Sequence, residues 1–155
     1  MASDGPPALA LISPQGWLSW QVLRGALVHG ERGSVGSFWS EFQEIVRLWR
    51  GRSPSLCAQS ALLLSAQSRE REARAELERI PLEQLRRRPM TQGYLGMLAG
   101  VAHASSVIGD RVRCAHVYEE LLPFAERNAV DVIWFCLGSV SHFLGLLALA
   151  LDRND

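Results

Sequence analysis

The chain has 155 residues, 48% of them hydrophobic, which is enough for one domain that buries a core without metal or disulfide support. Its sixteen basic and sixteen acidic residues cancel, which excludes a global charge that would recruit nucleic acid or an anionic membrane. Three widely spaced cysteines within apolar patterns are typical of a reduced, cytoplasmic protein.

Apolar residues recur with helical spacing, and we identify no stretch with the alternation of a strand. We therefore predict an all-α chain of about seven helices that follows an irregular N-terminal segment, 1–16. The prolines mark helix starts or ends, and Pro123 either ends or kinks the sixth helix. In chain order, the expected helices are Trp17–His29, Phe38–Trp49, Ser55–Ala66, Glu70–Ile80, Gln92–Val107, Arg111–Glu126 and Asp131–Leu151.

An internal repeat organises these helices. The segment from Ser68 aligns with the segment from Gly109, and a third copy starts at Gly33. Three positions of one helix face then coincide, occupied by Ala73, Leu77 and Ile80, by Cys114, Tyr118 and Leu121, and by Phe38, Phe42 and Ile45. Twelve residues earlier each copy has a small residue, which predicts a close helix crossing at Ala26, Ala61 and Ala102. With Asp152 in the slot of Gly109, the same count predicts a fourth crossing at Gly145.

The repeat predicts helical hairpins at about 17–50, 54–80 and 91–126, followed by a half-repeat at 131–155. These units form a single domain, 17–155, in which each hairpin stacks on its neighbours as a solenoid.

The segment "GDRVRCAHVYEELLPF" resembles a tetratricopeptide repeat in its Gly-Asp turn, small residue, aromatic residue and "EELLP" ending. Residues 68–153 resemble the divergent tetratricopeptide region of large bacterial regulators with an AAA-type ATPase core, found next to LuxR-type DNA-binding or class III nucleotide-cyclase domains. The residues that carry this resemblance are "REREARAELERI" (69–80), "YEELLPFAERNAV" (118–130) and "CLGSVSHFLGLLALALDR" (136–153).

The resemblance implies a short or truncated relative that acts as a protein-protein interaction module, scaffold or sensor in a bacterial regulatory system. The chain has no Walker motif, no cyclase aspartate pair and no DNA-reading helix pair, so no enzymatic activity and no cofactor is expected. In that family another helix follows the turn at "ALDRND".

A protein or peptide partner is expected to bind outward-facing residues of the first helix of each hairpin and exposed aromatic residues. The candidates are Trp39, Trp49, Gln59, Gln92, Tyr94, His103 and His142. The Arg clusters at 47–52 and 85–89 are assigned to helix ends and connections, so nucleic acid is not an expected partner.

Two alternative functions remain open from the sequence. One is a small-ligand or metal site built from His103, His116, Tyr118 and Glu119, although no ligand spacing supports a metal. The other is a remnant of a longer regulator without activity of its own.

Residues 132–151 contain no Asp, Glu, Lys or Arg, which permits a membrane span. Polar and helix-weakening residues in its interior, His142 and Gly145 among them, favour the first helix of a fourth hairpin instead. Its apolar face then needs a cover, so we predict a homodimer or larger assembly through 132–151, in which Trp134, Leu146 and Leu149 lie at the interface.

Overall fold

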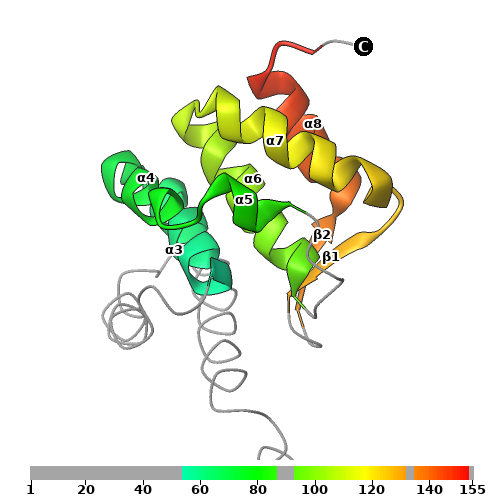
Figure 1. Ribbon diagram of the computed structural model, residues 1–155, viewed down its shortest axis with the longest axis horizontal. Coiled ribbons are helices and arrows are strands. Elements are labelled where there is room, and N and C mark those ends of the chain that lie inside the picture. The colour runs from blue at the N-terminus through cyan, green and yellow to red at the C-terminus, as the bar shows by residue number, and fades with distance from the viewer. Residues whose placement is uncertain (1–53, 87–92, 132–134, 154–155) are drawn as a thin grey trace, which may run out of the picture. The chain divides into compact units, whose positions relative to one another are not determined.

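The computed structural model describes residues 54–86, 93–131 and 135–153, all within one compact unit, Val46–Asp155. As expected, this part of the chain is mostly helical (Figure 1). The predicted helices Trp17–His29 and Phe38–Trp49 lie outside the described residues. The α-helices are α3 (Pro54–Ala66), α4 (Glu70–Glu78), α5 (Leu82–Leu85), α6 (Tyr94–Ile108), α7 (Arg111–Leu121) and α8 (Val140–Ala150).

Helix α6 is the centre of the packing. It contacts α3, α4, α7 and α8, and α7 also packs along α8 (Figure 1). The first helices α3 and α6 approach closely at Gly100, which has no side chain. A Cβ on this residue would lie only 3.1 Å from the carbonyl oxygen of Ala58. A side chain at position 100 would therefore push the two helices apart.

The three first helices, α3, α6 and α8, end in the same backbone conformation. Ser68, Gly109 and Asp152 have positive φ angles of 59°, 69° and 57°. The next amide, that of Arg69, Asp110 or Arg153, donates to the carbonyl five residues back, at 2.9, 3.0 and 2.9 Å. This left-handed C-cap ends a helix and turns the chain back along it. It falls at the positions that the repeat alignment matched.

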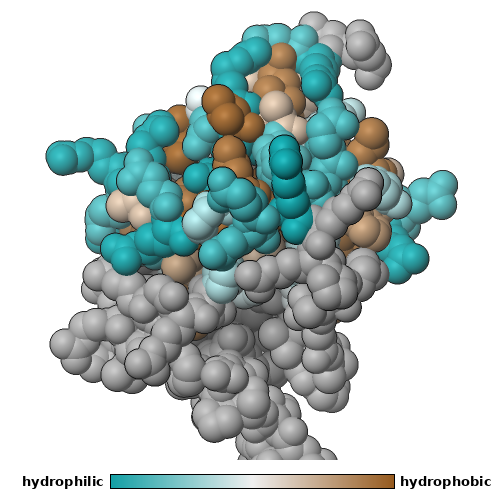
Figure 2. Space-filling model, viewed as in Figure 1, coloured by the Kyte–Doolittle hydropathy of each residue, from teal (hydrophilic) through white to brown (hydrophobic). Residues whose placement is uncertain are grey.

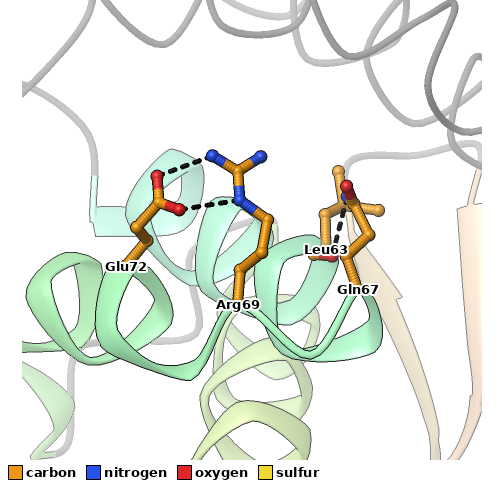
Figure 3. A network of polar contacts seen from close by, with 4 residues as sticks. All are labelled: Leu63, Gln67, Arg69 and Glu72. Carbon is orange, nitrogen blue, oxygen red and sulfur yellow. Dashed lines mark hydrogen bonds and ion pairs between the residues drawn. The ribbon is translucent and has the colours of Figure 1, made fainter.

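The turn after α3 carries further polar contacts (Figure 3). Gln67 donates from its side-chain amide to the carbonyl oxygen of Leu63 at 3.0 Å. Arg69 donates from Nε and Nη2 to the two carboxylate oxygens of Glu72, each at 2.7 Å. The first contact lies at the end of α3 and the second at the start of α4, where the bidentate geometry restricts the arginine to one orientation.

Arginines of the second helices, α4 and α7, donate to the ends of the following first helices. Arg74 Nη2 donates to the carbonyl of Ile108 at 3.0 Å, and Arg111 Nη2 donates to the carbonyl of Leu151 at 3.0 Å. Both carbonyls belong to the residue before the left-handed cap, where helix carbonyls have no helical partner. Each hairpin is thereby joined to the next through an equivalent carbonyl, although the two arginines occupy different positions of the repeat.

The prediction of one helix over Asp131–Leu151 is wrong. Two antiparallel strands, β1 (Asn128–Asp131) and β2 (Phe135–Ser139), precede α8 and pair with a bulge between Ala129 and Val130. The β-branched and aromatic residues in this stretch favour strands, so the expectation that the chain has no strand also fails. Gly138 has a φ of 126°, which a helix cannot contain, and Ser139 then caps α8.

Two smaller corrections concern the other helices. The helix expected over Arg111–Glu126 ends at Leu121 and continues as the 3-10 helix η2 (Leu122–Phe124), because Pro123 lacks the amide hydrogen that an α-helix needs. The one-turn helix α5 was not expected, since four residues are too few to show helical periodicity.

The caps allow a test of the backbone alone. Gly109→Ala should lower the free energy of unfolding by about 1 kcal/mol, because alanine avoids the left-handed conformation. Nothing lies within 4 Å of a Cβ at this position, so steric contacts do not add to the effect. Ser68→Gly, at the equivalent position, should instead raise the free energy of unfolding. Urea denaturation of both variants measures the two changes and whether each is destabilising or stabilising. A stable Gly109→Ala variant would contradict the role of the cap.

Candidate interaction surface

One face of α8 is buried and the opposite face is open. Val140, Phe143, Leu144 and Leu147 are buried against the rest of the domain. Ser141, Gly145 and Leu149 are exposed on the other side, and Leu149 is 72% exposed. Figure 2 shows hydrophobic residues among hydrophilic ones where α8 ends. Leu149 is the most exposed large hydrophobic side chain among the described residues, followed closely by Val112 on α7.

The repeat accounts for this open face. Ala61 and Ala102, the small residues of the two earlier first helices, have 0% exposure. Gly145 occupies the equivalent position in α8 but is exposed, and a Cβ there would have no neighbour within 4 Å. Ala61 and Ala102 are therefore enclosed by the domain, whereas no described residue covers α8 at Gly145.

A polar cluster joins the first helices α3 and α6. His103 of α6 is half-buried, and its Nδ1 lies 3.4 Å from the hydroxyl oxygen of Ser65 in α3. His142 of α8 is exposed and contacts the ring of Phe143 edge-on. Burial lowers the pKa of His103, and the nearby charge of His142 lowers it further. Of these two predicted partner-binding residues, His142 is exposed and His103 is only partly exposed.

Sequence reasoning did not identify Ser65 as a member of this cluster. Ser65 and His103 are distant in sequence and meet only because α3 packs on α6. No sequence spacing signals such a contact between helices.

Two other predicted partner-binding residues do not face outward. Gln59 is 3% exposed and Tyr94 is 5% exposed, so the expectation that they line an open groove is wrong. The Tyr94 hydroxyl donates to the carbonyl of Leu85 at 2.9 Å and lies 3.2 Å from a carboxylate oxygen of Glu120. Tyr94 therefore ties α5 and α7 to the start of α6.

The remaining predicted surface residues are either partly buried or outside the described part of the chain. Leu146 is partly buried, in contrast to its neighbour on the same helix, Leu149. Four residues lie outside the described part of the chain, namely Trp39, Trp49, Gln92 and Trp134.

The residues of the alternative ligand site are engaged in separate contacts. His103 lies with Ser65, whereas Arg153 contacts the ring of Tyr118 at 4.8 Å and the carboxylate of Glu119 at 3.3 Å. His116 Nε2 is buried without a hydrogen-bond partner in the described structure. Within the described ranges, no group of three or more His, Cys, Asp or Glu residues could hold a metal ion.

The apolar stretch 132–151 raised the question of a membrane span. Among residues 54–86, 93–131 and 135–153, no helix is both long and apolar enough to cross a membrane.

Comparisons with known proteins give no relative. No protein-family model, curated protein or solved structure matches the chain.

The environment of Tyr94 has a measurable consequence. Burial and then the negative charge of Glu120 raise its pKa from 10.0 to about 12. The fold therefore favours the neutral phenol, so its stabilising contribution is complete below about pH 10 and is lost as pH rises towards about 12. Tyr118→Phe leaves Tyr94 as the one tyrosine of the chain, and its tyrosinate absorbance should then titrate near pH 12. Titration near the usual value would contradict the described burial.

Proposed function

We propose that the chain is a non-catalytic protein-protein interaction module, built as a tetratricopeptide-like solenoid and acting as a scaffold in a bacterial regulatory system. Its self-association surface is the exposed side of α8, the open α8 face, formed by Ser141, Gly145 and Leu149. Two copies of the chain pack these faces together.

The observation that carries this proposal is the contrast between α8 and the earlier first helices. Ala61 and Ala102 are fully buried, whereas Gly145 is exposed beside a leucine with 72% exposure. The shared caps at Ser68, Gly109 and Asp152 support the solenoid, because the same turn repeated at each hairpin sets the same direction of chain reversal.

The physical argument for self-association rests on helix packing. Helices approach closely where the residues at their crossing are small, and Gly145 allows such an approach. Leu149 lies one turn further along the same face and loses exposed apolar surface when it is covered. Two copies related by a two-fold axis would each cover the other's exposed leucine.

The test is the solution mass of the full chain, measured by light scattering with sedimentation over a range of concentrations. The wild type should be a dimer, and Leu149→Glu should be a monomer because it places a charge at the centre of the contact. Val112→Glu is the matched control, since Val112 lies on α7 and is 71% exposed. This control variant should remain dimeric.

A second variant separates association from folding. Gly145→Leu improves helix propensity in α8, and its Cβ meets no atom within 4 Å at this exposed position, so the single chain should fold. The added side chain should nevertheless weaken a dimer that depends on a close crossing. A wild type that stays monomeric at every concentration would overturn self-association through the open α8 face.

A further inference from the structure

The exposed residues of α8 form a narrow stripe along the helix. His142, Gly145 and Leu149 are exposed and follow one another at intervals of three and four residues. Since an α-helix turns about 100° per residue, these three positions fall within a sector of about 60°. The opposite side holds buried residues such as Phe143 and Leu147. The stripe therefore has the spacing of the contact seam between two packed helices.

This stripe combines an open position with a projecting side chain. Gly145 has no side chain, and a Cβ there would meet nothing within 4 Å, so the helix backbone is open to an approaching group. Leu149 lies one turn further, about 6 Å along the helix axis, and is 72% exposed. The same face of a second copy carries both features. The orientation of that copy decides whether the leucine of one meets the glycine of the other.

A parallel two-fold arrangement of two α8 helices brings like residues together. The Leu149 side chains then meet each other and separate the helices, and Gly145 faces its own copy across a gap that no side chain fills. Such a gap loses dispersion contacts on both of its sides. His142 also faces the same histidine of the other copy, where two imidazolium groups repel. Size and charge therefore both disfavour the parallel arrangement.

An antiparallel arrangement brings unlike residues together. When the two-fold axis crosses α8 midway between Gly145 and Leu149, the leucine of each copy lies at the level of the glycine of the other, and the contact forms twice. The leucine fills the open position and loses exposed apolar surface, which stabilises the pair. Opposite ends of the two helices also lie near each other, so the partial charges of the helix ends attract.

The charged groups near the end of α8 are compatible with the antiparallel arrangement. His142 of one copy lies close to the level of Asp152 of the other, because the two positions are equally far from the two-fold axis. Asp152 pairs with Arg111 at 2.8 Å, and Arg153 pairs with Glu119 at 3.3 Å. These two pairs have no net charge, so His142 meets no excess of positive charge there.

We propose that two copies of the chain pack their open α8 faces in an antiparallel crossing, with Leu149 of each copy seated over Gly145 of the other. This inference rests on the proposed self-association and adds the orientation and register of the contact. Because each copy supplies both the leucine and the open position, one chain provides the whole contact twice.

Disulfide formation between introduced cysteines tests the orientation. The background is Cys136→Ser, since Cys136 is exposed whereas Cys57 and Cys114 are buried. Chains with Gly145→Cys and chains with Leu149→Cys are mixed, one of them isotopically labelled, and oxidised mildly. The mixture should form disulfide-linked dimers of one chain of each kind, whereas either variant alone should form almost none. Each mixed dimer keeps one native contact between a leucine and a glycine.

The geometry makes this result specific to the antiparallel crossing. There, the two cysteines of a single variant are displaced by four residues, about 6 Å along the axis, which exceeds the Cβ to Cβ distance of about 4 Å in a disulfide. His142→Cys is the matched control, because its displacement is ten residues, about 15 Å. This variant alone should form no disulfide, whereas a parallel arrangement would link each of the three variants to itself.

Light scattering of the Cys136→Ser chain before oxidation separates this inference from the proposed function. All three introduced cysteines replace exposed residues, so the single chains should fold. A dimer in which the variants link to themselves, or in which no mixture forms a disulfide, overturns the antiparallel crossing and leaves self-association standing. A chain that is monomeric at every concentration overturns both.

Discussion

The left-handed C-cap is the interaction on which the described fold depends. A first helix leaves its last carbonyls without helical partners, and one residue with positive φ lets the next amide reach back to them. Ser68, Gly109 and Asp152 each provide this turn. At the first two positions the chain then returns as a second helix, which brings Ala73 and Cys114 into the core at 0% exposure. The packing of each hairpin thus depends on the left-handed conformation of one residue at its turn.

Arginine side chains extend the caps from one hairpin to the next. Arg74 and Arg111 donate to the carbonyls of Ile108 and Leu151, directly before a left-handed residue. A guanidinium with several donors suits this role, because it can bind carbonyls that lie at different angles. Arg111 also binds Asp152, so one side chain connects the end of α8 to α7 through both backbone and side-chain oxygens. Each of these arginines therefore connects the end of a first helix to the second helix that precedes it in the chain.

The open α8 face follows from the position of α8. It packs on α6 and α7, and no described residue covers its remaining side. His142 lies on this helix at an exposed position, whereas His103 of α6 is half-buried and its Nδ1 lies 3.4 Å from the hydroxyl oxygen of Ser65 in α3.

The sequence by itself determined the approximate extents of α3, α4, α6 and most of α7 and the positions of the turns that follow the first helices, because helical periodicity and turn chemistry act over a few residues. Tertiary structure decided what local patterns could not. The strands around Val130 and Cys136 form by pairing with each other and packing on α6, and the uncharged run after Asp131 does not reveal that pairing. Tyr94 and His103 are both polar residues of α6, yet Tyr94 is buried by its bond to Leu85 while His103 remains half-exposed. The physical reason is that burial depends on which helices pack together, whereas helix formation and capping depend on neighbours along the chain.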